Sequence, residues 1–162
     1  MTLPSIVVIL LPENKAWFFR ESAKKENDMA IFKAKSIMTT NVASVKRQTP
    51  IYEAIRILVE KNITGLPVVN DDMTLAGIIS EKDVLRLLYD IEDKPGKVED
   101  FMTKGIVSFN QEDSLIDITE CLIKNNFRRV TITSEGKLVG IISRKDIIKF
   151  ILKLRHKDKT AD

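Results

Sequence analysis

The sequence has one cysteine and one histidine among 162 residues. Cys121 alone cannot form an intramolecular disulfide, so we expect a reducing, cytoplasmic compartment. With His156 as the only histidine, we recognise neither a metal cluster nor a pair of nucleophile and base. His156 stands among basic residues near the end of the sequence, which favours a solvated basic tail. These absences argue against catalysis, and we expect that the protein is not an enzyme.

Long apolar runs and an excess of one charge are missing as well. The longest apolar run, residues 6–11, is far shorter than the about 20 residues that cross a bilayer, and the first residues lack the pattern of a signal peptide. Basic and acidic residues number 26 and 23 and are interspersed, whereas nucleic-acid binding needs a concentrated basic face. We therefore expect no membrane span and no nucleic-acid partner.

The sequence does contain an internal repeat. Ser-Ile-Met-Thr at 36–39 is matched by Asp-Phe-Met-Thr at 100–103, and GIISEKD at 77–83 returns as GIISRKD at 140–146. Apolar residues make up 44% and charged residues 30% of the chain, a balance typical of folded soluble domains. Two copies of one unit are therefore expected to pack into one globule.

Periodicity predicts the same elements in each unit. Apolar residues at helical spacing predict amphipathic helices over 51–59 and 115–123. Short apolar runs on either side of a polar turn predict two strands next, and a second helix closes each unit, at 80–89 and 143–155. We predict an α/β (α+β) fold in which each unit has a three-stranded sheet and two helices, packed about a pseudo-twofold axis.

These phrases, taken together, resemble the CBS (cystathionine-beta-synthase) domain pair, or Bateman module. The phrases that carry the resemblance are Ser-Ile-Met-Thr at 36–39, Ile-Thr-Gly-Leu-Pro-Val-Val at 63–69 and the two copies of Gly-Ile-Ile-Ser-x-Lys-Asp. The resemblance covers about residues 34–155. It implies repeats at 34–90 and 99–155, a linker at 91–98, an N-terminal extension at 1–33 and a basic tail at 156–162.

The resemblance also implies a regulatory ligand, an adenine nucleotide (AMP, ADP or ATP) or S-adenosylmethionine, bound in clefts between the repeats. The family motif makes Asp83 and Asp146 acceptors for ribose hydroxyls and places Ser80 and Ser143 near phosphate. A helix N-terminus favours an anion, and a carboxylate suits a neutral diol. The glycine that opens each motif is expected to let a backbone and the ligand approach without a side chain in the way.

A plainer interpretation of the two Ser-x-x-Asp phrases is a capping box, with serine as N-cap and the acidic residue at N3. That role requires no ligand. The same serine can serve both purposes, so the sequence leaves both interpretations open.

The remaining predicted site residues come from the resemblance. The adenine pocket is assigned to Thr40, Asn41, Val42, Leu66, Pro67, Lys104, Gly105, Ile106 and Val130. Arg128 and Arg129 are assigned to phosphate, because guanidinium groups pair with it bidentately, and Arg144 is added to the ribose and phosphate residues. Solvated surface charge is the alternative for the arginines. Because Thr131 replaces the family proline in the second repeat, we expect two unequal clefts.

Two functions of different class remain. The first is a nucleotide-binding regulatory module, of the energy-sensing kind, that acts on an unidentified effector protein. The second is a structural dimerisation or interaction module with vestigial clefts. Apolar residues on the closing helices exceed what one buried face needs, which predicts a homodimer. Exposed aromatic residues at 17–19 would form an apolar patch, so residues 1–33 are expected to pack on the module or on a second subunit.

Overall fold

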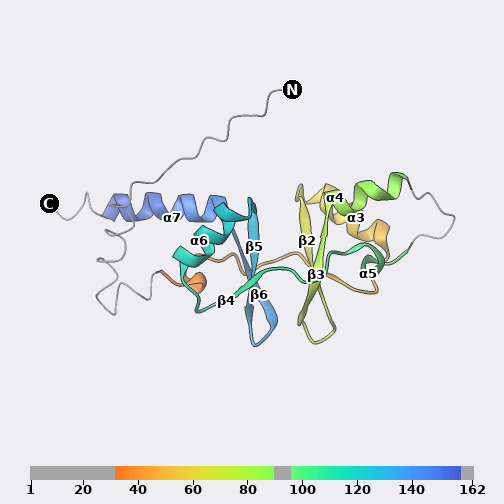
Figure 1. Ribbon diagram of the computed structural model, residues 1–162, viewed down its shortest axis with the longest axis horizontal. Helices are drawn as coiled ribbons and strands as arrows, with labels where there is room; N and C mark the ends of the chain where they lie inside the picture. Colours follow the sequence, from red (N-terminus) through yellow and green to blue (C-terminus); the bar gives the residue numbers. More distant parts are fainter. Residues whose placement is uncertain (1–31, 90–95, 158–162) are drawn as a thin grey trace, which may run out of the picture. The chain divides into compact units, whose positions relative to one another are not determined.

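The computed structural model describes residues 32–89 and 96–157, with side chains up to residue 155. The predictions for the N-terminal extension, for most of the linker and for the side chains of the basic tail therefore fall outside the described residues. Within them the chain forms two three-stranded sheets, and each sheet carries its helices on the side away from the other sheet (Figure 1).

The first sheet and its helices follow the predicted order. Its elements are η1 (Ala34–Ser36), β1 (Val45–Lys46), α3 (Ile51–Glu60), β2 (Gly65–Val69), β3 (Leu75–Ser80), α4 (Glu81–Leu85) and η2 (Arg86–Leu88). The strand order is β1-β2-β3, with β1 parallel and β3 antiparallel to the central strand.

The second repeat has the same topology. Its elements are α5 (Val98–Phe101), β4 (Ser108–Asn110), α6 (Leu115–Lys124), β5 (Arg129–Ser134), β6 (Lys137–Ser143) and α7 (Arg144–Lys157). The predicted sequence of strand, helix, strand, strand, helix is thus confirmed twice. The closing helices differ in length, because α7 has 14 residues whereas α4 has five and continues as the short 3-10 turn η2.

Each repeat has its own apolar core between its sheet and its first helix. In the first repeat Ile51, Ala54 and Leu58 form the buried stripe of α3, and the matching stripe of α6 is Leu115, Ile118 and Leu122. These spacings place the three side chains on one helix face, as the periodicity predicts. The stripes pack on alternate residues of the central strands.

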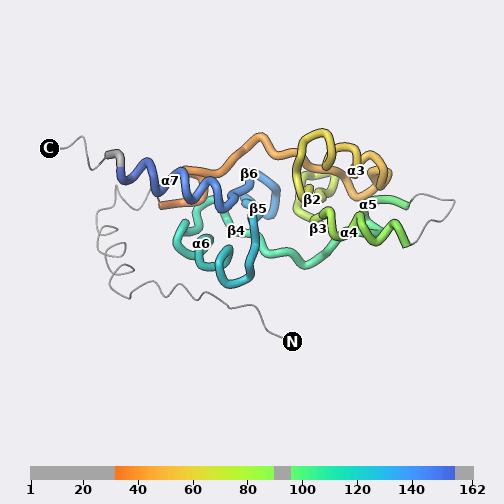
Figure 2. The backbone as a smooth tube through the Cα atoms, turned by 90° about the horizontal axis from the view of Figure 1, so that it is seen from above, coloured from red at the N-terminus to blue at the C-terminus, as the bar shows by residue number. Residues whose placement is uncertain are grey.

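The segment before the first strand of each repeat packs in the core of the other repeat. Ala34 is fully buried in the second core, whereas Val98 and Met102 are buried in the first. Figure 2 shows the chain crossing between the repeats after each of these segments, once in orange and once in teal. The repeats therefore exchange these segments and are interlocked. Periodicity within each unit does not reveal this exchange.

Main-chain pairing secures the exchanged segments at related positions. Thr39 bridges Ile141 of β6, and Thr103 bridges Ile78 of β3. In addition, the ammonium groups of Lys33 and Lys35 lie 2.7 and 2.6 Å from the carboxylate of Glu112 in the second repeat. The hydrogen bond from Lys33, and after it the one from Lys35, lowers the pKa of Glu112 below its usual value.

The glycine of each repeated motif accommodates an exchanged segment. A Cβ at Gly77 would lie 2.6 Å from the carbonyl oxygen of Thr103, and one at Gly140 would lie 2.6 Å from the Sδ of Met38. Both approaches are shorter than a carbon atom tolerates. The group that approaches each glycine is thus the protein's own chain, and room for a ligand at these glycines stays a prediction.

Gly77→Ala should destabilise the fold more than Gly140→Ala. Two hydrogen bonds, of 3.0 and 2.9 Å, fix the Thr103 backbone against Ile78, so its carbonyl cannot retreat. At Gly140 the two nearest atoms, Sδ and Cγ of Met38 at 2.6 and 2.9 Å, belong to a side chain that can change rotamer, and only its Cβ, at 3.1 Å, is held by the backbone. We expect Gly77→Ala to lower the free energy of unfolding by about 3 kcal/mol and Gly140→Ala by about 1 kcal/mol, measured by urea unfolding.

Gly65→Ala is the matched control for these two variants. An added Cβ there would meet its nearest atoms at 3.5 Å, an ordinary contact, so stability should change little. Equal losses for all three variants would mean that the exchanged segments do not set the need for glycine.

Candidate functional site

The strands of each repeat present an uncovered face toward the other repeat. In the second sheet Arg129 pairs with Ser143, and Thr131 pairs with Ile141. Because side chains alternate along a strand, these four lie on one face, and the residues between them enter the core. The same alternation in the first sheet places Gly65, Pro67, Ile78 and Ser80 together; in that sheet Gly65 is opposite Ser80 and Pro67 is opposite Ile78.

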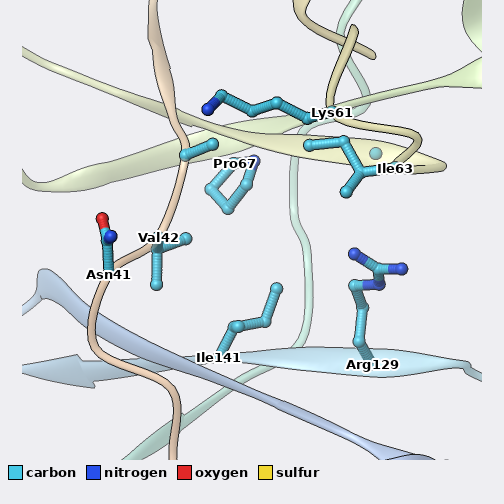
Figure 3. Close-up of a pocket in the computed structure, with 9 residues that line it drawn as sticks. Asn41, Val42, Lys61, Ile63, Pro67, Arg129 and Ile141 are labelled. Atoms are coloured by element: carbon cyan, nitrogen blue, oxygen red, sulfur yellow. The ribbon is translucent and has the colours of Figure 1, made fainter. Parts of the chain in front are cut away.

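A cavity of about 310 Å³ lies between these faces (Figure 3). Its lining comes from three places: the crossing segment after η1, the end of α3 with β2, and the strands β5 and β6. The lining residues are Asn41, Val42, Ala43, Lys61, Ile63, Gly65, Pro67, Arg129 and Ile141. The cavity therefore combines side chains of both repeats.

The cavity contains four of the residues predicted from the sequence. Asn41, Val42 and Pro67 were expected around adenine, and Arg129 was expected at phosphate; all four line the same cavity. Thr40 is exposed and does not line it. The apolar side chains of Val42, Pro67 and Ile141 stand around the middle of the view in Figure 3, and Arg129 rises beside them.

The structure corrects two members of the predicted adenine pocket. Leu66 and Val130 are 0% and 4% exposed and belong to the two cores. Each side chain points away from the cleft because its neighbour in the strand points into it, Pro67 in β2 and Arg129 in β5. The motif identifies the strand, but only the alternation of side chains along it tells which residues face the cleft.

The other predicted adenine residues are the counterparts, in the second repeat, of residues 40–42. Lys104 and Gly105 are exposed and Ile106 is half-buried, and none of them lines the 310 Å³ cavity. Thr131 occupies the position that Pro67 has in the first repeat, and its hydroxyl lies 3.5 Å from the Val107 carbonyl oxygen. The two repeats thus differ at this position, and the expectation of two unequal clefts stays a prediction.

Both Ser-x-x-Asp phrases form hydrogen bonds of the capping-box type. Oδ2 of Asp83 accepts the Ser80 amide at 2.9 Å and the Ser80 hydroxyl at 2.6 Å. Oδ2 of Asp146 accepts the Ser143 amide at 2.8 Å and the Ser143 hydroxyl at 2.6 Å. Each aspartate therefore has a structural role at a helix start, and one oxygen of each carboxylate is left for another donor.

The second carboxylate oxygens differ in their surroundings. Asp83 is only 7% exposed, and its Oδ1 lies 3.3 Å from the hydroxyl of Thr103, which belongs to an exchanged segment. Asp146 is half-buried, and no group among the described residues donates to its Oδ1. Asp146 lies in the first turn of α7, directly after β6, whose Ile141 lines the cavity. Ser80, Asp83, Ser143 and Asp146 are not themselves among the lining residues.

Two cations line the cavity, and only one of them was predicted. The Nε of Arg129 is buried without a hydrogen-bond partner among the described residues. Lys61, at the C-terminal end of α3, is exposed and lies beyond 4.0 Å from any carboxylate in the described part of the chain. Lys61 corresponds to Asn125 in the second repeat, and this charge difference is the signal that the sequence offered.

Arg144 does not lie in the cleft, and its assignment to the ligand is corrected. Its guanidinium donates to the carbonyls of Phe127 and Leu122, at 2.6 and 3.2 Å, and to the amide oxygen of Asn126 at 2.9 Å. A cation stabilises the exposed carbonyls at a helix C-terminus. Arg144 thus caps α6, whereas Arg128 is exposed.

Other classes of site find no support in the described residues. No group of three or more histidine, cysteine or acidic side chains is arranged to hold a metal ion there. The described helices are also too short or too polar for a membrane span.

Two interlocked repeats that face each other across a ligand-sized cavity define a tandem binding module. The chain belongs to the CBS domain family, which matches it at residues 34–90 and 98–153. Similar sequences include an uncharacterised protein of Methanocaldococcus jannaschii, 38% identical over 117 residues, which are 72% of this chain and 42% of that protein.

A second relative is CBSX2, a chloroplastic CBS domain-containing protein of Arabidopsis thaliana. It is 28% identical over 150 residues, which cover 75% of this chain and 63% of CBSX2. Inosine-5'-monophosphate dehydrogenase of M. jannaschii is 36% identical over 121 residues, but these are only 24% of that enzyme. The chain thus spans less than two thirds of the length of each of these three relatives.

Solved structures show the same fold. The crystal structure of CBSX2 in complex with AMP superposes with a TM-score of 0.70 at 30% identity, covering 76% of this chain and 98% of that one. The CBS domain pair of protein MJ0100, in complex with 5'-methylthioadenosine and S-adenosyl-L-methionine, has a TM-score of 0.63 at 24% identity, covering 75% and 96%. The latter likeness concerns the fold alone.

Arg144→Ala should lower stability without weakening a ligand in the cleft. The helix cap is lost, so we expect a decrease of about 1 kcal/mol in the free energy of unfolding, because the group is partly exposed. Urea unfolding measures it. Arg128→Ala is the control, since Arg128 is exposed and should change stability by less than about 0.5 kcal/mol. The capping role of Arg144 would be wrong if both variants unfolded at the same urea concentration as the parent.

Proposed function

We propose that the chain is a regulatory module that binds an adenosine-type ligand, AMP, ADP, ATP or S-adenosylmethionine, in the 310 Å³ cavity. The observation that supports this most is the meeting of Val42, Pro67 and Ile141 with Arg129 in one cavity between the repeats. Apolar side chains suit the faces of a base, and a guanidinium suits a phosphate. CBSX2, which is 30% identical in its solved structure, binds AMP.

In this proposal the ribose lies at Asp146. Its Oδ1 has an unused acceptor position, and hydroxyl groups of a ribose are donors that suit it. The start of α7, a helix of 14 residues, contributes a positive dipole end that favours phosphate next to Ser143. The capping box and the ligand then use different oxygens of one carboxylate, which reconciles the two interpretations of the Ser-x-x-Asp phrase.

Regulation requires that the ligand prefer one arrangement of the repeats. Because the cavity is lined from both, a ligand that contacts both walls favours the arrangement in which they are closest. CBS domain pairs are regulatory modules, and we propose that this chain, too, acts on a partner protein in the cytoplasm and is not itself an enzyme. The partner remains to be identified by the effect of nucleotide on its activity.

A homodimer is part of the same proposal. Large apolar side chains are exposed on the helices of both repeats, among them Val59, Leu85 and Leu88 in the first and Ile123, Ile148 and Leu152 in the second. Surfaces of this kind mark protein contacts. Sedimentation equilibrium should give twice the mass of one chain, and a monomer at all concentrations would remove this part of the proposal.

Asp146→Glu should weaken nucleotide binding, whereas Asp83→Glu should not. The longer carboxylate at 146 occupies the space of the ribose, but glutamate at N3 still forms a capping box. We expect the parent to gain about 2.7 kcal/mol of stability with AMP at 100 times its dissociation constant. Asp146→Glu should need at least about tenfold more AMP for the same thermal shift.

Asp83→Glu is the matched control, because the same substitution is made in the other repeat. Absence of a shift with AMP, ADP, ATP and S-adenosylmethionine for the parent would favour the alternative, a structural interaction module. Equal binding by all three proteins would disprove the ribose role of Asp146.

A further inference from the structure

We infer that the cavity selects adenosine ligands that carry phosphate over neutral or cationic ones, an inference that rests on the proposed function. Lys61 is then a specificity-determining residue. Lys61 would act together with Arg129 from the opposite repeat. The ligand class is therefore a nucleoside phosphate, as opposed to a thioether nucleoside such as 5'-methylthioadenosine or a sulfonium such as S-adenosylmethionine.

The charge of the lining supports this selection. Lys61 and Arg129 are cations, and none of the other lining residues is acidic. The Nε of Arg129 is buried without a partner, which is costly unless a ligand supplies an acceptor. A phosphate supplies several anionic acceptors. A neutral nucleoside offers Arg129 only uncharged acceptors, which bind a guanidinium more weakly than phosphate does, and a sulfonium would add a third positive charge to the cavity.

The two cations stand on opposite walls. Arg129 comes from β5 of the second repeat, whereas Lys61 comes from the end of α3 in the first, on the other side of the cavity in Figure 3. An anion between them is attracted by both walls, whereas without it the walls carry like charges that repel. Phosphate thus contributes to closing the repeats together, which a neutral nucleoside cannot do.

Lys61 has one competing explanation that does not involve a ligand. A lysine at the end of a helix interacts favourably with the helix dipole, and Lys61 directly follows α3. That role predicts a small loss of stability on substitution and an equal effect on every ligand. Selection of phosphate predicts instead that the ratio of affinities for AMP and 5'-methylthioadenosine changes.

The positions related by the pseudo-twofold lack the lysine of this pair. When the two repeats are aligned, Lys61 corresponds to Asn125, Arg129 to Gly65 and Pro67 to Thr131. Lys104 is placed like Thr40, which does not line the described cavity. The inference therefore includes a stoichiometry of one nucleotide per chain.

Calorimetric titration of the full chain with AMP, adenosine, 5'-methylthioadenosine and S-adenosylmethionine tests the inference. The parent should bind one AMP per chain, at least about tenfold more tightly than the other three, and more weakly as salt is raised. Lys61→Met should weaken AMP about tenfold and leave 5'-methylthioadenosine unchanged. Lys61→Glu should weaken AMP further and strengthen S-adenosylmethionine.

Lys124→Met is the control, since Lys124 is an exposed lysine in the last turn of α6, the counterpart of α3. It should bind AMP as the parent does. Equal affinity of the parent for AMP and 5'-methylthioadenosine would overturn the selection while leaving an adenosine-binding module in place. The role of Lys61 is overturned if Lys61→Met keeps the parent's ratio. Binding of none of the four ligands would overturn both the inference and the proposed function.

Discussion

The structure depends on the close contact between each exchanged segment and the strand glycine of the other repeat. Met38 lies against Gly140, and Met102 with the carbonyl of Thr103 lies against Gly77. Once these contacts form, Ala34 and Val98 enter opposite cores, and the chain must cross between the repeats twice. The cavity exists because the first crossing carries Asn41 and Val42 past β6 before β1 begins.

The two copies of the repeated motif make different contacts in the structure. In both, serine and aspartate start a helix, but the second carboxylate oxygen of Asp83 accepts from Thr103, whereas that of Asp146 has no donor among the described residues. The variable position after serine is Glu81 in one copy and Arg144 in the other, and only Arg144 reaches the carbonyls at the end of the preceding helix. Local helix energetics therefore explains a difference that resembled a difference in ligand preference.

The sequence was sufficient to predict the fold, because repeat, helical stripe and strand alternation each leave a pattern that can be read locally. Local patterns could not show that Asn41, Val42 and Pro67 line one cavity with Arg129, because this arrangement depends on the exchange of segments between the repeats. Leu66 and Val130 were misplaced for a different reason, since a motif names a strand but not which of its faces is buried. Arg144 was misassigned because charge alone does not distinguish a phosphate from a row of helix carbonyls. The ligand roles of the aspartates stay a prediction.

The exchange of segments also bears on how such a chain can arise and be divided. A single repeat on its own would have an empty place in its core where the neighbour's segment belongs, and an apolar segment of its own with nowhere to go. Two copies of one repeat could each fill the other's vacancy, so an ancestral half-length chain would have to associate before it could be stable. Fusion of the two copies then makes that association intramolecular. Within one chain, the pair of repeats is accordingly the smallest unit in which both cores are complete.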